Sequence, residues 1–418
     1  MFNNDYICAL DIGSSKIAAC VARVKRGRIN NIFFDSLPAK GIKEGIIVDS
    51  MDLVSSVTKL LKNLKNKSGI NIKFVYTNIS GKNIITKHSH ATVPLAERGN
   101  KIISVLDLEK VNEQARILGS NLEEEIIHRI PFGYTIDTNS NILNPLGLYS
   151  HKLQLDLYLI CAKLSSVQSL SRVINQSGYE LKGLLFSGLA TGKAVFNKEL
   201  KEGFNLVCDI GCDITELLVF KDGLLCDIEI LPFGGNDLTL QIQNALQVPF
   251  DLAEDIKRSY GIIGDPMEIE EDREILVKKD SIYKNIKQRF VAEVINSKAK
   301  SICSIIKDTI EKKVQRYEVN KFIVVGRSIL LEGFIETLES LLEIPVKLGR
   351  IMNPEILSLT KEDSTVSGHK YLTYLTALGM ICEVQEESTK GTLPTHQPAK
   401  NLILKTINRF KEVYQEYF

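Results

Sequence analysis

The sequence predicts an α/β protein built from two related lobes that face each other across a cleft. The main observation is an internal repeat, in which residues 206–223 reproduce the pattern of residues 9–27. Asp209 stands 198 positions after Asp11. Each copy reads as strand, turn, strand and strand, because short apolar runs alternate with glycine-containing turns. The composition agrees, since 418 residues with 44% hydrophobic and 25% charged residues can form several ordinary cores.

Charge and cysteine usage exclude several classes of protein. The 52 Lys and Arg residues balance 51 Asp and Glu residues, so no overall field attracts nucleic acid and no nucleic-acid partner is expected. Asp5 and Asp11 lie in the first apolar stretch with no basic segment before them, which argues against a signal peptide. No apolar run reaches the roughly 18 residues that a membrane span needs. The eight cysteines form no Cys-x-x-Cys pair and are expected to be reduced thiols in a cytoplasmic protein.

The order of elements predicts further units within and between the two lobes. Leucine and valine at helical spacing predict a helix over 53–64, followed by a strand at 74–79. A change of pattern marks a compact α/β unit from residue 81 to 162. After the second repeat we expect helices at 236–246, 252–260, 285–295 and 298–314, an exposed charged loop at 268–274 and a strand at 321–325. Residues 386–400 are polar, contain two prolines and have no periodicity, which predicts a linker.

The repeated turns predict a nucleotide cleft between the lobes. A strand that ends in Asp-x-Gly and turns back can present backbone N–H groups to a phosphate, and its Asp can hold a magnesium-bound water. Gly13 and Gly211 have no Cβ, so a phosphate can approach the backbone closely at these positions. One such turn is usually a plain β-turn. Two copies at equivalent places in a repeat favour a phosphate-binding cleft.

The chain resembles the FtsA family of bacterial cell-division proteins, which belongs to the superfamily of actin, sugar kinases and heat-shock-chaperone ATPases. The resemblance covers nearly the whole length and rests on residues 9–16, 41–49, 79–81, 128–131, 144–147, 232–235 and 254–261. It implies an actin-like fold with ribonuclease H-like duplicated lobes. The unit at 81–162 sits where FtsA carries its distinctive inserted subdomain.

The resemblance implies a division into subdomains. The first lobe would comprise 1–80 and 163–200, with part of 370–385 returning to it, and 81–162 would be the inserted subdomain. The second lobe would comprise 201–240 and 308–369, with a small helical subdomain at 241–307. A flexible linker at 386–400 and an amphipathic membrane-targeting helix at 401–418 would complete the chain.

The resemblance also implies that the cleft binds ATP and Mg²⁺. Asp11 and Asp209 would bind the metal ion. Glu254 and Lys257 would frame the ribose and adenine, although as an isolated pair they would read as a surface ion pair on a helix. The remaining residues of the implied site are Gly13, Ser14, Ser15 and Lys16 in the first phosphate loop, Gly211 and Thr215 in the second, Gly234 and Gly235 behind the phosphates and ribose, and Gly326 and Ser328 on the adenine side.

Departures from the family pattern predict a weak or altered site. The second loop carries Cys212, Asp213, Ile214 and Glu216 where the family has Gly, Thr and a final Asp. A carboxylate near 4 Å from a phosphate oxygen costs on the order of 4 kcal/mol at an effective dielectric of about 20. Ser187 stands where relatives usually place the Glu or Gln that orients the attacking water. We therefore expect weak ATP binding or an altered or empty cleft, no assigned catalytic residue and at most a weak ATPase.

The C-terminal segment 401–418 has the pattern of an amphipathic helix. From Lys400 onward four basic side chains oppose two acidic ones, a local charge of +2 that attracts anionic lipids. A terminal helix docked on the protein's own core is the alternative. The preceding linker, the terminal aromatic residues and the resemblance to the FtsA membrane-targeting tail favour the membrane. The expected contacts are the apolar Ile403, Leu404, Ile407, Phe410, Tyr414, Tyr417 and Phe418 and the basic Lys405, Arg409 and Lys411.

The resemblance implies a role as a peripheral protein on the cytoplasmic face of the cell membrane. The chain would tether polymers of the tubulin-like protein FtsZ, act with other divisome proteins and self-associate into filaments. The FtsZ tail would meet the basic residues of the small subdomain, which are Lys284, Lys287, Arg289, Lys298 and Lys300. Alternative hypotheses are a scaffold of pilus assembly like PilM, a small-molecule kinase of the same fold, and a chaperone. A chaperone would need a substrate domain that the remaining chain cannot supply.

Overall fold

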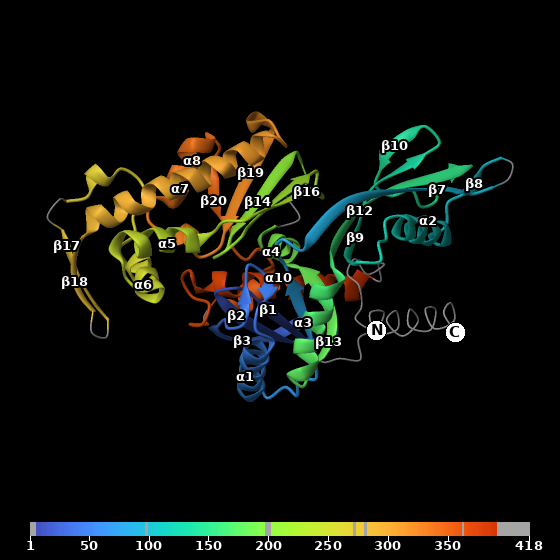
Figure 1. Cartoon of the computed structure of the whole chain (residues 1–418). Coiled ribbons are helices and arrows are strands. Elements are labelled where there is room, and N and C mark those ends of the chain that lie inside the picture. Colours follow the sequence, from blue (N-terminus) through green and yellow to red (C-terminus); the bar gives the residue numbers. More distant parts are fainter. Residues whose placement is uncertain are drawn as a thin grey trace, which may run out of the picture.

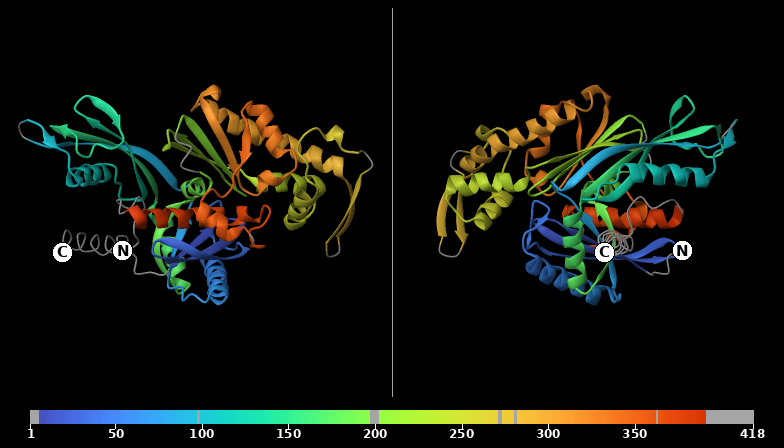
Figure 2. Two further views of the ribbon diagram at one scale, coloured as in Figure 1. Left: turned by 180° about the vertical axis from the view of Figure 1, so that it is seen from behind. Right: turned by 45° about the vertical axis from the view of Figure 1, so that its right-hand side comes forward.

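A computed structural model describes residues 6–96, 99–196, 202–270, 273–279, 282–361 and 363–390. It has two lobes stacked on each other, with an additional subdomain attached to each (Figure 1). The two additional subdomains extend from opposite sides of the molecule, as the front and back views both show (Figures 1 and 2). Among the described residues no helix is long and apolar enough to cross a membrane.

The first lobe contains a five-stranded sheet in the order β13-β6-β1-β2-β3. Strands β1 (Tyr6–Ile12), β2 (Lys16–Lys25) and β3 (Arg28–Pro38) form an antiparallel meander, and β6 (Phe74–Ile79) and β13 (Glu180–Phe186) continue the sheet in parallel. Helices α1 (Ser50–Ser68) and α3 (Leu164–Gln176) pack against one face. The predicted apolar stripe of α1 is buried there, and the helix is capped by the Asp49 side chain.

The second lobe repeats this topology. Its sheet has the order β16-β15-β14-β19-β20, formed by β14 (Phe204–Ile210), β15 (Thr215–Lys221), β16 (Leu224–Leu231), β19 (Val319–Val325) and β20 (Val346–Leu348). Again three antiparallel strands are followed by two parallel ones. Helix α8 (Phe334–Leu342) packs on the outer face of this sheet. The predicted duplication is confirmed.

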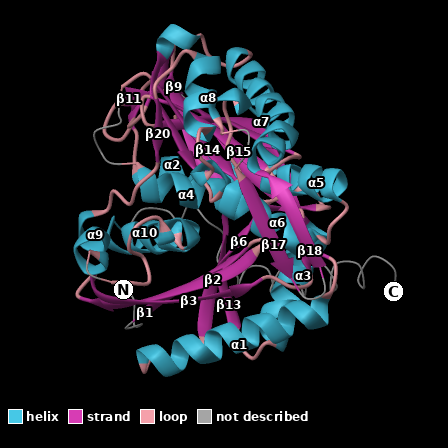
Figure 3. Cartoon of the chain, turned by 90° about the vertical axis from the view of Figure 1, so that its left-hand side faces the viewer, coloured by secondary structure: helices cyan, strands magenta, loops and turns pink. Residues whose placement is uncertain are grey.

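Two helices lie between the sheets. Helix α4 (Ser187–Val195) contacts both sheets, and α10 (Leu375–Lys390) packs on α4 and on β1 (Figure 3). Their contact is close because Gly379 of α10 lies against the backbone of α4. A Cβ built at Gly379 would come within 1.7 Å of the Ala190 carbonyl oxygen. The shared core is therefore assembled from residues that are far apart in the sequence.

The inserted subdomain has one four-stranded sheet and one helix. The sheet order is β10-β9-β12-β7, with β7 (Ile84–Pro94), β9 (Glu124–Ile136), β10 (Asn139–Ile142) and β12 (Lys152–Lys163). Helix α2 (Val105–Leu118) covers one face and begins at a capping box formed by Ser104 and Asp107. A short ribbon pairs β8 (Lys101–Ile102) with β11 (Tyr149–Ser150).

The small subdomain differs from the predicted purely helical unit. Helices α5 (Gly235–Leu246) and α6 (Phe250–Tyr260) are followed by a hairpin of β17 (Glu274–Lys279) and β18 (Ile282–Lys287). The helices predicted at 285–295 and 298–314 are instead one helix, α7 (Gln288–Glu311). Asn296 lies between the two predicted ranges; it is buried in α7, and its side-chain oxygen accepts from the Gly264 amide at 2.9 Å.

Part of the range predicted as a linker is helical. Helix α10 continues to Lys390, so the first residues of the range 386–400 are helical. The rest of that range and the predicted amphipathic helix at 401–418 lie outside the described residues. Two short hairpin strands, β4 (Ile42–Lys43) and β5 (Ile46–Ile47), bring a turn of the first lobe to the cleft, and η4 (Lys370–Thr373) precedes α10. Helix α9 (Pro354–Thr360) lies against β3.

Candidate functional site: the cleft between the lobes

The cleft is bordered by two hairpin turns of identical length. In the β1–β2 turn the Gly13 amide donates to the Lys16 carbonyl at 3.0 Å. In the β14–β15 turn the Gly211 amide donates to the Ile214 carbonyl, also at 3.0 Å. A Cβ at Gly211 would come within 2.8 Å of that carbonyl oxygen, which explains the glycine. The sequence repeat is thus a repeat of backbone geometry.

A cavity of about 400 Å³ lies between these turns. Two of the predicted binding residues do not line it. Thr215 is fully buried and donates its hydroxyl to the Phe233 carbonyl at 2.9 Å, while a Cβ at Gly234 would collide with the carbonyl oxygens of Gly211 and Cys212 at 2.6 Å. Both shape the loop instead of facing the cavity. The other predicted residues line it, namely Asp11, Gly13, Ser14, Ser15, Lys16, Asp209, Gly211, Gly235, Glu254, Lys257, Gly326 and Ser328.

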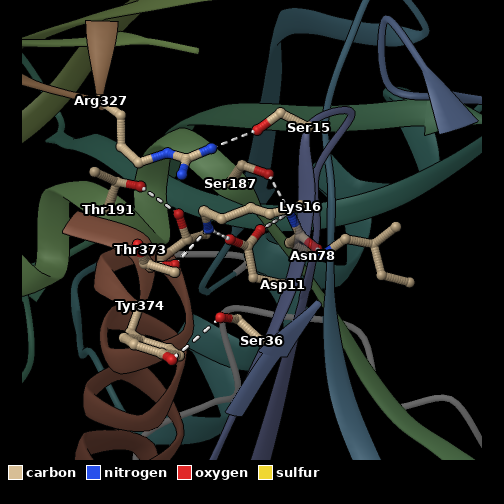
Figure 4. Close-up of polar contacts among 12 residues, drawn as sticks. Asp11, Ser15, Lys16, Ser36, Asn78, Ser187, Thr191, Arg327, Thr373 and Tyr374 are labelled. Atoms are coloured by element: carbon tan, nitrogen blue, oxygen red, sulfur yellow. Dashed lines mark hydrogen bonds and ion pairs between the residues drawn. The ribbon is translucent and has the colours of Figure 1, made fainter. Parts of the chain in front are cut away.

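The floor on the first-lobe side is a network centred on Asp11 (Figure 4). Lys16 Nζ lies 2.9 Å from Asp11 Oδ2 and also donates to the Thr373 carbonyl. Asn78, at the end of β6, donates to Asp11 Oδ1 and to Ser187 Oγ, both at 2.8 Å. Ser187 in turn donates to the Ile79 carbonyl at 3.3 Å. The hydroxyl at the position expected to orient water is therefore committed to structural hydrogen bonds.

On the second-lobe side two carboxyl groups are buried. Burial raises the pKa of Asp209 to about 6, and the charge of Asp11 adds to the increase. The Asp209 carboxylate accepts from Thr191 of α4 at 3.3 Å. Burial also raises the pKa of Glu216 to about 8, although this side chain accepts a hydrogen bond from Ser80. Burial thus favours the neutral form of both carboxyl groups.

Asp11 and Asp209 suit a hard cation. Their charges already influence each other, and a bound cation would relieve that repulsion. Magnesium typically uses one or two carboxylates and takes its other ligands from water and substrate phosphates. Within the described ranges no group of three or more His, Cys, Asp or Glu side chains could hold a metal ion without such added ligands. The donor set fits Mg²⁺ that arrives with a phosphate ligand.

The residues predicted at the adenine side form a buried cluster, so the surface-pair interpretation is wrong for Lys257. Its side chain is 6% exposed, lies 2.6 Å from Glu254, and donates to the Gly235 carbonyl at 2.9 Å and to Thr239 at 2.8 Å. Burial lowers the pKa of Lys257, an effect that Glu254 only partly offsets. Burial tends to raise the pKa of Glu254, but Lys257, Thr239 and Arg258 together lower it by more, and the net change is downward. The pair anchors α6 to the start of α5.

Several residues of the cleft were not predicted. Asn78 and Thr373 contact Asp11 and Lys16 of the first lobe, and Thr191 contacts Asp209 of the second. Arg327 follows Gly326 at the end of β19. Gly326 has φ +100, and a Cβ there would lie 2.1 Å from the Ile210 carbonyl oxygen. A usable signal existed for Asn78, because it is a polar residue at the end of an apolar strand that neighbours β1.

Hydrogen bonds cross the cleft between the lobes. Arg327 of the second lobe donates to Ser15 Oγ at 2.9 Å, and Ser80 of the first lobe donates to Glu216. The backbone amide of Glu44, in the β4–β5 turn, donates to Asp213 Oδ2 at 3.0 Å. These contacts join the two lobes across the cleft.

Of the basic residues expected to meet an acidic peptide, three already have partners within the small subdomain. Lys284 donates to the Leu246 carbonyl, and Arg289 donates to the Ile269 carbonyl at 2.7 Å. Lys298 lies 3.1 Å from Asp237. Lys287 and Lys300 are exposed. The predicted basic surface is therefore smaller than its five charges suggest.

Comparisons with known proteins identify similar sequences across most of the chain. The model of the family "Cell division protein FtsA" matches residues 206–379, and that of the SHS2 domain inserted in FTSA matches residues 81–161. FtsA of Escherichia coli K12 is 25% identical over 395 residues, which cover 92% of this chain and 91% of the relative. FtsA of Neisseria meningitidis serogroup B is 24% identical over 348 residues, covering 82% and 83%. FtsA of Borreliella burgdorferi is 26% identical over 356 residues, covering 84% and 86%.

Solved structures with low sequence identity have the same fold. A chain of a PilM–PilN type IV pilus biogenesis complex superposes with a TM-score of 0.59 and 15% identity, covering 90% of this chain and 98% of the other. MreB 5 of Spiroplasma citri bound to AMPPNP superposes with a TM-score of 0.52 and 13% identity, covering 94% and 100%. The predicted actin-like α/β fold with an inserted subdomain is confirmed.

Proposed function

Because this chain belongs to the FtsA family of cell-division proteins, we propose that it tethers FtsZ polymers to the cytoplasmic membrane. The observation that carries the proposal is the combination of an actin-like body with the subdomain that the FtsA family inserts into it. The protein would be peripheral, act at the septum with other divisome proteins and assemble into actin-like filaments. The pilus scaffold that shares its fold is a weaker candidate, because that similarity at 15% identity concerns the fold alone.

The proposed membrane contact is the amphipathic segment 401–418. Its apolar side chains recur at intervals of three and four residues, and basic side chains lie between them, as in helices that lie in the plane of a membrane surface. The binding residues would be the apolar set from Ile403 to Phe418 together with Lys405, Arg409 and Lys411. Ten residues of sequence separate this segment from the end of α10 at Lys390.

Deleting residues 401–418 should abolish sedimentation with liposomes that contain anionic lipid. The expected result is a shift of nearly all protein from pellet to supernatant, because the apolar stripe supplies the burial that holds the protein on the lipid. A matched variant, Lys405→Gln with Arg409→Gln and Lys411→Gln, should weaken binding to anionic vesicles much more than to neutral ones. Equal sedimentation of the deletion variant and the full chain would refute the tether.

We propose that the cleft binds ATP with Mg²⁺ weakly and uses it for assembly instead of catalysis. Ser14, Ser15 and Lys16 would bind the phosphates, and Asp11 and Asp209 would bind Mg²⁺. The adenine and ribose would lie toward Glu254, Lys257, Gly326 and Ser328. The hydrogen bonds that occupy Ser187 support slow or absent turnover, so the protein would act as at most a weak ATPase.

The FtsZ contact is proposed on the small subdomain, where Lys287 and Lys300 are the exposed members of the predicted basic set. Full-length protein, FtsZ polymers and anionic liposomes should sediment or float together, and omission of this protein should leave FtsZ unattached. The double variant Lys287→Glu and Lys300→Glu should reduce FtsZ recruitment while liposome binding stays unchanged. Attachment of FtsZ to the liposomes in the absence of this protein would contradict the proposed function.

A further inference from the structure

The two turns that border the cleft differ in one chemical respect. Ser15 and Asp213 are equivalent positions, 198 residues apart, so a neutral hydroxyl in the first turn corresponds to a carboxylate in the second. Each reaches the opposite lobe. Ser15 Oγ accepts from Arg327 of the second lobe at 2.9 Å, and Asp213 Oδ2 accepts from the Glu44 amide of the first lobe at 3.0 Å. Each turn thus contributes one acceptor to a hydrogen bond between the lobes, and only the acceptor of the second turn is a carboxylate.

Both oxygens of Asp213 are held by the protein. Asp213 Oδ1 accepts from the side-chain amide of Asn236, at the start of α5, at 2.6 Å. The Glu44 amide is held in place because the adjacent Gly45 amide donates to Ser14 Oγ at 3.3 Å. A Cβ at Gly45 would lie 2.8 Å from the Ser80 carbonyl oxygen, so this turn is closely packed. One carboxylate is therefore bound between two lobes by donors set into each of them.

These donors are of the type that binds anionic ligand oxygens. Backbone and side-chain N–H groups directed into a cavity stabilise negative charge, and Asp213 lines the same cavity as Gly13, Ser14 and Ser15. We propose that Asp213 determines the ligand specificity of the cleft, because its carboxylate occupies donors that would otherwise receive a phosphate of the ligand. The proposal rests on the nucleotide role proposed above.

The proposal makes affinity depend on the number of phosphates. Each added phosphate brings further negative charge near a fixed carboxylate, so repulsion increases from AMP to ADP to ATP. A nucleotide with fewer phosphates would be repelled least by the Asp213 carboxylate.

The test is calorimetric titration of AMP, ADP and ATP, each with Mg²⁺, into full-length wild type and Asp213→Asn. Asparagine keeps an oxygen that can accept from the Glu44 amide but removes the charge. ATP affinity should increase at least about tenfold, a change of about 1.4 kcal/mol, ADP affinity should increase less, and AMP affinity should change less than about twofold. The matched control is Asp222→Asn, in the β15–β16 turn, where the carboxylate accepts from the Gly203 amide at 2.9 Å. Its three affinities should equal those of wild type.

Three results would overturn the proposal: an unchanged ATP affinity in Asp213→Asn, an equal gain for all three nucleotides, or no binding of any adenine nucleotide to either protein. Hydrogen exchange provides a second readout. In Asp213→Ala, which removes the acceptor, the Glu44 amide should exchange faster than in Asp213→Asn. Equal protection in the two variants would exclude the hydrogen bond between residue 213 and the Glu44 amide. None of these outcomes affects co-sedimentation with FtsZ and liposomes, so failure of this inference remains distinct from failure of the tethering role.

Discussion

Gly379→Ala should lower the free energy of unfolding by about 2–3 kcal/mol, the upper range for overpacking a close contact. The added methyl group would have to occupy space within 1.7 Å of the Ala190 carbonyl oxygen and 2.5 Å of its carbonyl carbon. These are backbone atoms of α4, which cannot rotate away as a side chain could. The two helices must separate, and the shared core between the sheets loses contacts. Urea denaturation followed by circular dichroism would measure the change.

Gly192→Ala is the matched control, because Gly192 lies on α4 itself. The nearest atom to a Cβ there is Cζ of the Phe220 ring at 3.3 Å, a side chain that can shift by a few tenths of an ångström. Alanine also favours a helix over glycine by up to about 1 kcal/mol. Gly192→Ala should therefore change the stability by less than about 1 kcal/mol. Similar losses for the two variants would show that close helix packing is not the reason for Gly379.

Wild-type protein should lose about 2 kcal/mol of stability between about pH 6 and about pH 8, and Glu216→Gln should remove most of this loss. The pKa of Glu216 is raised from 4.5 to about 8 in the folded protein, mainly by burial. Between these values the folded state binds a proton that the unfolded state has released. Stability from this group is therefore fully present below pH 4.5 and is lost as the pH rises through the folded pKa.

Glutamine is a suitable replacement because it is neutral at every pH and its side-chain oxygen can still accept from Ser80. The pKa of Asp209, about 6, places its own contribution at lower pH, so the window above about pH 6 isolates Glu216. Urea midpoints measured at several pH values would give the slope. The control Glu180→Gln changes an exposed carboxylate in β13 and should retain the wild-type slope. A flat wild-type profile would refute the buried, protonated Glu216.

The paired hairpins could be predicted from the sequence because an Asp-x-Gly turn is local and its repetition is visible without a structure. Asp11 and Asp209 face one cavity as expected, and so do most of the residues assigned to the site. The contributions of Asn78 and Arg327 could not be predicted in the same way. Each lies at the end of a parallel strand, and only the sheet order places it beside a turn that is distant in sequence.

One wrong prediction and one rejected alternative have physical reasons. The strand β18 contains the alternation Ile282, Lys284, Ile286 among polar residues, which is too short and too basic to separate from the helix that follows. A surface ion pair was the alternative interpretation of Glu254 and Lys257, because helical spacing alone does not report burial. Its ammonium group satisfies the Gly235 carbonyl and Thr239 inside the protein, which a sequence pattern cannot indicate.

The position of α10 determines which lobe can complete its folding first while the chain is being translated. Helix α10 packs on β1, the first described strand, although it is encoded more than 360 residues later, at Leu375–Lys390. Until the ribosome has released that helix, apolar residues of β1 and β2 such as Ile7, Ala9 and Cys20 lack part of their cover. The lobe that is translated first is therefore completed last, whereas the strands of the second lobe are all available beforehand. Nascent chains should depend on a chaperone to shield that sheet face.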